Sequence, residues 1–396
     1  MTLAQPLRGG PSPIGRAAAL VLTPFVIAVA ALANAGCSGS EEAGADENRA
    51  DSAAAGQDAA IGTEDSGSPD TSSAFDAGSA FDIDGDDANW SDATTDTAVV
   101  KILGPPYPIV LAHGFFGFDK FAGLNFATYF YKVVPHLQSK GEKHVYTPAV
   151  DPFNSSTVRG TQLIKRIEAI LAKTGHSKVN IIGHSQGGLD ARVVASLRPD
   201  LVASVTTYAT PNLGSPIADM AMKLLPTKEL QKLLDALTKA IGAPVYDKGG
   251  KASSVVEGIK QFTKEGIAAF NKKYPNDDAV AYFSVTGRTG NMFGGSACKP
   301  DKEVAFIKDF ALVVDPVDVL FAVQEALIDG TLTAPIVNDG MVQVKSGRWG
   351  TFLGCVPADH MDEVGHLLGD KPGLFNPWNH LVFFDKYVGW LRSQGH

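Results

Sequence analysis

The segment Gly183-His184-Ser185-Gln186-Gly187 places one serine between two glycines, directly after the apolar run 179–182. A serine hydroxyl can attack an acyl carbonyl when a tight strand-to-helix turn exposes it, and glycines two positions away on either side prevent collisions in that turn. A helix starting at Gln186 would turn free N–H groups and the positive end of its dipole toward the reacting oxygen. The spacing predicts Ser185 as the nucleophile of an acyl-transfer reaction.

A second motif, His113-Gly114-Phe115, follows another apolar run at 107–112. Acyl transfer by a serine needs two N–H donors for the oxyanion, one after the nucleophile and one from a loop after an earlier strand. We therefore expect the backbone N–H groups of Phe115 and Gln186 to form the oxyanion hole. The alternative interpretation is a plain turn after a strand.

The elements that must position these residues alternate along the chain. Short apolar runs suited to strands lie at 107–112, 144–150, 179–182, 202–208 and 280–286, and amphipathic helical patterns lie at 157–173 and 186–197. Such alternation predicts an α/β fold with a mostly parallel central sheet and helices on both faces. Residues 216–275 interrupt the rhythm with further helical segments, such as 217–225 and 230–241, and we interpret them as an insertion.

The first quarter of the chain has a different composition. Residues 1–37 combine Arg8 and Arg16 with a short apolar run and small residues, which is typical of an export signal. Residues 38–97 contain sixteen Asp and Glu residues and one basic residue, Arg49, and such a segment predicts a disordered, acidic tether. The catalytic domain is expected at 98–396. Its 31 basic and 27 acidic residues form no basic stripe, which argues against nucleic-acid binding.

Several of these motifs together resemble the bacterial true lipases of the Pseudomonas and Burkholderia type. The resemblance rests on the segments 108–114, 117–119, 183–188, 209–211 and 214–216, and it covers about residues 105–372. It implies an α/β-hydrolase fold and a carboxylic-ester hydrolase that cleaves long-chain acylglycerols at a lipid–water interface. It also implies a membrane-anchored foldase as a potential partner. We expect a monomer.

The same resemblance assigns the partners of Ser185. Asn338-Asp339-Gly340 is similar to the family segment that carries the triad acid, and Asp359-His360-Met361 is similar to the one that carries the histidine. Asp339 and His360 would then complete a triad in the order Ser, Asp, His, as in other α/β hydrolases. His380 remains an alternative base, and Asp315 an alternative acid.

A structural calcium ion is also implied by the resemblance. The carboxylates of Asp315 and Asp362 would bind it, together with the backbone carbonyls of His366 and Asp370, because calcium prefers oxygen ligands. The ion would hold the histidine loop, remote from the reacting bond. Alternatively, Asp315 caps a turn and Asp362 is an acid at a helix N-terminus.

The three cysteines suggest different roles. Cys298 and Cys355 could form a disulfide in an exported protein, or remain two separate thiols. The relatives that have a disulfide place a cysteine near Lys345, so a bridge here would be shifted. Ala35-Gly36-Cys37 resembles the lipidation motif of bacterial lipoproteins, which predicts an outer-membrane or cell-surface lipoprotein. Ordinary cleavage and full secretion is the alternative.

The function of the insertion, and of the whole chain, leaves alternatives open. Leucines and methionines at 216–250 recur at helical spacing, which indicates either a lid over the site or a helix packed on the core. The triad would equally suit a short-chain esterase, a phospholipase or a polyester depolymerase. A different class of function is a non-catalytic surface-binding lipoprotein.

Overall fold

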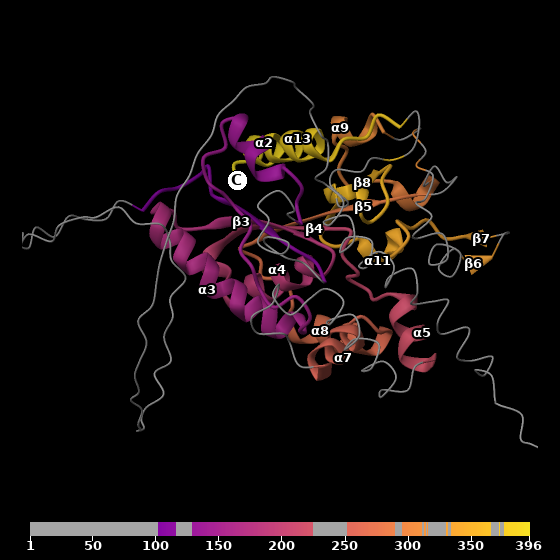
Figure 1. The fold of residues 1–396 in the computed structure, drawn as a ribbon. Helices are drawn as coiled ribbons and strands as arrows, with labels where there is room; N and C mark the ends of the chain where they lie inside the picture. Colours follow the sequence, from indigo (N-terminus) through magenta and orange to yellow (C-terminus); the bar gives the residue numbers. More distant parts are fainter. Residues whose placement is uncertain are drawn as a thin grey trace, which may run out of the picture. The chain divides into compact units, whose positions relative to one another are not determined.

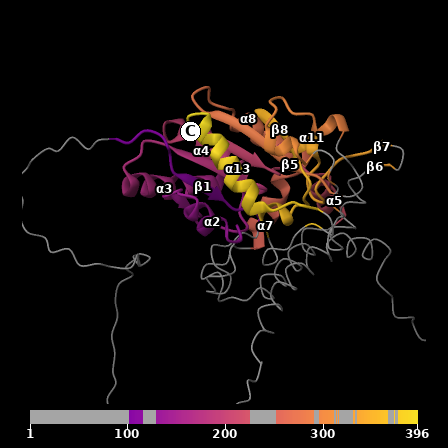
Figure 2. The ribbon, with the colours of Figure 1, turned by 90° about the horizontal axis from the view of Figure 1, so that it is seen from above.

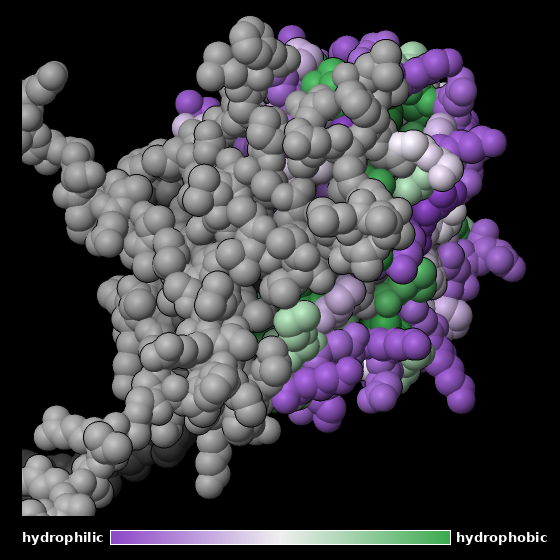
Figure 3. Space-filling model, turned by 90° about the vertical axis from the view of Figure 1, so that its right-hand side faces the viewer, coloured by the Kyte–Doolittle hydropathy of each residue, from purple (hydrophilic) through white to green (hydrophobic). Residues whose placement is uncertain are grey.

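The computed structural model describes residues 102–115, 129–224, 252–289, 295–310, 313, 315, 330–331, 334–365, 372 and 376–396. The predicted leader with Cys37, the acidic tether, the helix at 230–241 and the predicted calcium ligands His366 and Asp370 lie outside these residues. Among the described residues, no helix is both long and apolar enough to cross a bilayer. The coloured residues on the face in Figure 3 are mostly hydrophilic, with hydrophobic residues in separate patches.

A six-stranded parallel sheet forms the centre of the described fold. Its strand order is β2-β1-β3-β4-β5-β8, and each neighbouring pair is parallel. The strands are β1 (Ile109–Ala112), β2 (Val145–Tyr146), β3 (Val179–His184), β4 (Val202–Tyr208), β5 (Ala281–Gly287) and β8 (Thr351–Val356). The strands are buried almost throughout because helices cover both faces, which explains their continuous apolar runs. A separate two-stranded antiparallel sheet is formed by β6 (Gly330–Thr331) and β7 (Ala334–Pro335).

Helices lie on both faces of the sheet (Figures 1 and 2). A hydrophobic core fills the space on each face. On one face lie α3 (Ser156–Thr174) and α4 (Gln186–Leu197), and on the other lie α2 (Val133–Ser139) and α13 (His380–Ser393). The predicted mostly parallel α/β sheet with helices on both faces is therefore confirmed. Shorter helical pieces are η1 (Pro199–Leu201), η2 (Gly295–Cys298), α9 (Ala305–Lys308), α11 (Val344–Gly347) and η3 (Asp362–Val364).

The predicted insertion contributes three described helices, α5 (Pro216–Leu224), α7 (Ala252–Gln261) and α8 (Lys264–Lys273). Helix α8 packs on α4, where Ile267 and Phe270 join Leu189 in one hydrophobic cluster. The end of α7 is also anchored, because the Gln261 side chain accepts a hydrogen bond from the Ser156 N–H at the start of α3 (2.8 Å). The end of the insertion is thus docked on the core, and its role as a lid stays a prediction.

The candidate chemistry gathers at one edge of the sheet. Phe115 follows β1, Ser185 follows β3 and His360 follows β8, each beyond the carboxyl end of its strand. In parallel α/β sheets, ligands bind beyond the carboxyl ends of the strands, near the point where strand order reverses. The order β2-β1-β3 places that reversal between β1 and β3, next to Ser185.

Candidate active site

Ser185 occupies the strand-to-helix turn that its motif predicts. Its backbone has φ 55° and ψ −128°, in the positive-φ region that residues with a side chain rarely adopt and that costs on the order of 1–3 kcal/mol. The flanking glycines permit this turn. A Cβ on Gly183 would lie 2.3 Å from the Gly187 carbonyl oxygen, and one on Gly187 would lie 2.1 Å from the Ala112 carbonyl oxygen. Ser185 therefore keeps its strained backbone conformation between two positions, Gly183 and Gly187, that have no room for a side chain.

Ser185, His360 and Asp339 form one hydrogen-bonded chain. His360 Nε2 lies 2.9 Å from Ser185 Oγ, and His360 Nδ1 lies 2.9 Å from Asp339 Oδ2. In the neutral tautomer that carries its proton on Nδ1, the imidazole donates to the carboxylate and accepts from the serine hydroxyl. This is the arrangement in which a histidine can take the proton of an attacking serine.

The backbone around Asp339 fixes that carboxylate. Its Oδ1 accepts hydrogen bonds from the N–H groups of Met341 (2.8 Å) and Val342 (2.6 Å), which leaves Oδ2 directed at His360. The His360 N–H also donates to the Asp339 carbonyl (2.9 Å). Acid and base are thus joined through both backbone and side chains, so their separation does not depend on one contact.

The two alternative partners occupy other places. His380 begins α13, and its Nε2–H donates to the Tyr131 carbonyl (2.9 Å) rather than to the serine. In this geometry His360, and not His380, has the ring nitrogen that lies within hydrogen-bond distance of Ser185 Oγ. Asp315 lies in a separate cluster of acids, so it does not replace Asp339 either.

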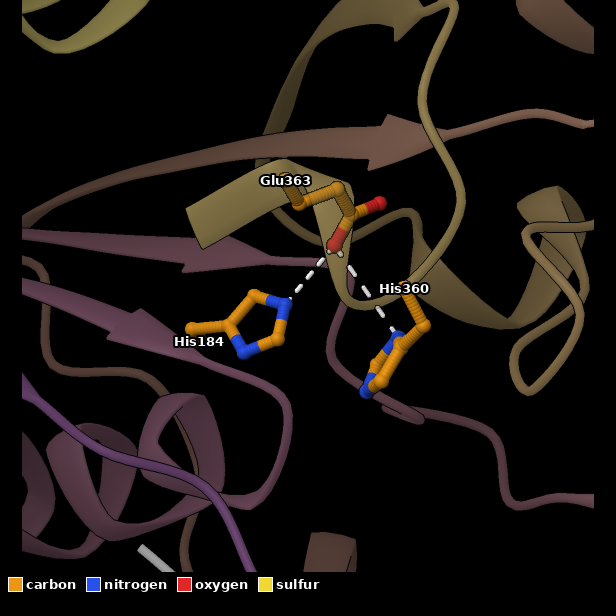
Figure 4. A group of neighbouring side chains, drawn as sticks. All are labelled: His184, His360 and Glu363. Carbon is orange, nitrogen blue, oxygen red and sulfur yellow. Dashed lines mark hydrogen bonds and ion pairs between the residues drawn. The ribbon is translucent and has the colours of Figure 1, made fainter. Parts of the chain in front are cut away.

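A second buried network lies beside the chain and was not predicted from the sequence. Glu363 Oε2 lies 2.8 Å from His184 Nε2 and 3.9 Å from His360 Nδ1 (Figure 4). Tyr129 extends the network, because its hydroxyl lies 2.7 Å from His184 Nδ1. Burial, reinforced by the nearby Asp339 carboxylate, raises the pKa of Glu363 well above its ordinary value. The hydrogen bond from His360 to Asp339 is shorter by 1 Å than the approach of Glu363.

The acids predicted to bind calcium meet in the fold. Asp315, Asp359 and Asp362 are all buried, and each offers a carboxylate oxygen within 4.8 Å of the others. Sequence reasoning named Asp315 and Asp362 and missed Asp359, which directly precedes His360. Three close carboxylates are a donor set that suits a hard cation, so the residues present fit calcium.

The proposed oxyanion loop packs directly against the nucleophile. A Cβ on Gly114 would lie 2.7 Å from Ser185 Cβ and 2.4 Å from the Tyr129 hydroxyl, so only glycine allows this approach. The next residue, Phe115, carries the N–H expected in the oxyanion hole. Gln186 begins α4, where the first backbone N–H groups have no partner within the helix.

The predicted disulfide is present between Cys298 and Cys355, whose Cα atoms lie 5.3 Å apart. It joins the short helix η2 to β8, the strand that leads to His360. Cys355 is buried and Cys298 is partly exposed.

A parallel sheet of this order, with a serine in a strained turn after β3 and a histidine after β8, defines the α/β-hydrolase class. A family model described as the alpha/beta hydrolase fold matches residues 107–240. The crystal structure of Staphylococcus hyicus lipase superposes with a TM-score of 0.50 at 17% identity, covering 74% of this chain and 97% of that chain. At this identity the likeness supports the fold.

Sequence relatives narrow the class. The chain is 37% identical over 272 residues to a triacylglycerol lipase of Vibrio cholerae, covering 66% of this chain and 81% of the relative. It is 32% identical to the triacylglycerol lipase of Burkholderia plantarii (73% and 87% covered) and 31% identical to that of Pseudomonas fragi (68% and 92% covered). The chain belongs to the bacterial triacylglycerol lipase family of the α/β-hydrolase superfamily.

Proposed function

We propose that this protein is an exported triacylglycerol lipase that cleaves long-chain acylglycerols with Ser185 as nucleophile, His360 as general base and Asp339 as acid. The observation that carries the proposal is the unbroken chain Ser185–His360–Asp339, with both hydrogen bonds at 2.9 Å and the serine in a strained turn. The family relatives support the class of substrate, since those named above are triacylglycerol lipases.

In the first half of the reaction, the Ser185 oxygen attacks the ester carbonyl while His360 Nε2 takes the hydroxyl proton. The Asp339 carboxylate stabilises the resulting imidazolium and keeps its Nδ1 proton in place. The N–H groups of Phe115 and Gln186 stabilise the oxyanion of the tetrahedral intermediate. Collapse of the intermediate breaks the ester C–O bond, and the imidazolium proton passes to the departing glycerol oxygen.

The second half releases the acid. A water molecule attacks the acyl-enzyme carbonyl, and His360 accepts one proton from that water. The tetrahedral intermediate then expels Ser185, which regains its proton from the imidazolium, and a free fatty acid leaves. The same base and oxyanion donors therefore serve both halves.

We propose that Asp315 and Asp362, together with Asp359, hold a structural calcium ion. The support is the buried cluster of their three carboxylates, two of which, Asp359 and Asp362, lie within two positions of His360 in the chain. Bound calcium would supply the positive charge that lets these carboxylates remain ionised side by side. The backbone carbonyls of His366 and Asp370 remain predicted ligands.

Export is part of the proposal. It is supported by the leader-like residues 1–37 and by the disulfide, since disulfides persist mainly in oxidising compartments. Cys37 would carry a lipid anchor after cleavage. Intact mass of the purified mature chain tests this directly. An N-terminal diacylated Cys37 supports the lipoprotein, and an unmodified N-terminus elsewhere near residues 33–37 would favour full secretion.

Hydrolysis rates across a series of p-nitrophenyl esters test the substrate class. A lipase should prefer chains of about ten carbons or more and should hydrolyse emulsified trioleoylglycerol. Preference for acetate or butyrate would indicate a short-chain esterase. Faster release of fatty acid from phosphatidylcholine vesicles, or from a polyester film, would replace the proposal with a phospholipase or a depolymerase.

A further inference from the structure

Arg159 lies at the start of α3, where its guanidinium makes four hydrogen bonds and an ion pair inside the protein. Nε and Nη2 each lie 2.8 Å from Asp190 Oδ2, and Nη2 also donates to the His113 carbonyl (2.6 Å). Nη1 donates to the carbonyls of Gly114 (3.2 Å) and Asp151 (3.0 Å). Both charged side chains are completely buried, with 0% exposure. The guanidinium therefore joins the nucleophile helix to the loop after β1.

The two carbonyls after β1 are the important acceptors. The carbonyl of Gly114 and the N–H of Phe115 belong to the same peptide unit, which is planar and trans. Holding that carbonyl on one side consequently fixes the direction of the N–H on the other side. His113 adds a second contact, because its Nδ1 lies 3.0 Å from the same Gly114 oxygen. The peptide unit that carries the proposed oxyanion donor is thus held by contacts to its carbonyl oxygen, on the side opposite the N–H.

Asp190 is the counter-charge that makes this arrangement stable. A guanidinium buried without an anion would carry a large desolvation penalty, and Asp190 sits in the second turn of α4, five residues after Ser185. The two helices approach closely here, since a Cβ on Gly160 would lie 2.5 Å from Val193 Cβ. Burial raises the pKa of Asp190 to about 6 against the opposing effect of the Arg159 cation, so the carboxylate is ionised at pH 8.

We infer that the Asp190–Arg159 pair is a positioning device for the oxyanion hole, which sets the Phe115 N–H relative to Ser185 through the Gly114 carbonyl. The inference rests on the proposed function. Both residues are positioning residues, since neither is placed on the substrate. A fixed donor direction matters because oxyanion stabilisation requires donors that are already oriented when charge develops.

The test compares Asp190→Asn and Arg159→Lys with the wild type at pH 8, on p-nitrophenyl decanoate. Both variants should lose about tenfold or more in kcat with KM within about twofold, because a displaced donor weakens transition-state binding rather than substrate binding. The Ki of a trifluoromethyl ketone, which forms a tetrahedral adduct with the serine, should rise by a similar factor. The lysine in Arg159→Lys keeps the positive charge but offers fewer N–H donors than arginine, so this variant should retain little of the positioning effect.

A matched control is Glu142→Gln, which breaks the Arg392–Glu142 pair between α13 and the loop before β2. That pair has no contact with the oxyanion loop, so kcat and Ki should stay within about twofold of wild type even if melting falls. If the single variants do not fold, the paired replacement Arg159→Met with Asp190→Leu removes both buried charges and tests the same point.

Wild-type kcat and Ki in a folded Asp190 or Arg159 variant would overturn the inference. An equal loss in Glu142→Gln would overturn it too, because the effect would then reflect general destabilisation. Ser185→Ala is assayed in parallel. If it remains active, the proposed function fails; if it is inactive while Asp190→Asn is fully active, only the positioning inference fails.

Discussion

His360 Nε2 and Ser185 Oγ lie 2.9 Å apart although 175 positions separate the two residues in the chain. The contact exists because β3 and β8 end at the same edge of the parallel sheet. Two carboxyl groups, those of Asp339 and Glu363, also lie near the imidazole at this edge.

The first prediction concerns which carboxylate serves His360. Asp339→Ala should lower kcat on p-nitrophenyl decanoate at least about tenfold more than Glu363→Gln does, because only Asp339 lies within hydrogen-bond distance of Nδ1. Steady-state kinetics of both variants, with melting curves to confirm folding, give the comparison. A larger loss in Glu363→Gln would reverse the assignment of the acid.

Acid sensitivity of stability is predicted from His113. Burial, with a smaller effect of the Arg159 cation, lowers the pKa of His113 from 6.5 to about 3 in the folded protein. The hydrogen bonds agree, since Nε2 accepts from the Val150 N–H (3.3 Å) and is left without a proton. The unfolded chain therefore binds a proton between pH 6.5 and pH 3 that the folded chain does not bind, and stability falls as pH is lowered.

Urea unfolding of wild type and His113→Gln at pH 7, 6, 5 and 4 measures this effect. As the pH is lowered, the wild type should lose stability relative to His113→Gln. Below pH 6 this relative loss of unfolding free energy should approach about 1.4 kcal/mol per pH unit. A difference that stays constant from pH 7 to pH 4 would mean that the folded His113 titrates normally.

Calcium removal is predicted to loosen the histidine loop. EDTA should lower the melting temperature of the wild type by several degrees, and added calcium should restore it, because the ion offsets repulsion within the acid cluster. Asp315→Asn should melt lower without EDTA and respond little to it. Identical melting curves with EDTA and with excess calcium would remove the proposed ion.

The disulfide should contribute stability without contributing to the chemistry. Its two cysteines are 57 positions apart, and closing a loop of that size stabilises a fold by about 2–4 kcal/mol. Replacing both Cys298 and Cys355 with alanine should lower the unfolding free energy by that amount and leave kcat within about twofold. An unchanged urea midpoint would show that the bond adds nothing to stability.

Much of the fold could be predicted because its signals are local. The helix 186–197 and the strand 202–208 were predicted at their observed bounds, since each is one continuous periodic or apolar run. The strand predicted at 144–150 is only Val145–Tyr146, which lies at the edge of the sheet and, among the described residues, pairs with β1 on one side. Strand β8 was not predicted, although its six residues complete the sheet.

The candidate site divides in the same way. Ser185 and the His113-Gly114-Phe115 loop have short motifs of their own, whereas Asp339 and His360 were assigned only through a family resemblance. Arg159 and Asp190 were missed because their partners are distant in sequence. One signal was available, since Arg159 lies four residues before Leu163 on the buried face of α3. A charged residue at such a position needs a buried partner.

The central claim is that Ser185 carries out the hydrolysis of acylglycerols. Its most direct test is fatty-acid release from emulsified trioleoylglycerol by wild type and Ser185→Ala, with peptide mass spectrometry after treatment with a fluorophosphonate. The wild type should release oleate and carry the phosphonyl group on Ser185. The variant should lose about 10⁴-fold or more in kcat while keeping its melting temperature and staying unlabelled. Sustained oleate release by the folded variant, or labelling at another residue, would contradict the claim.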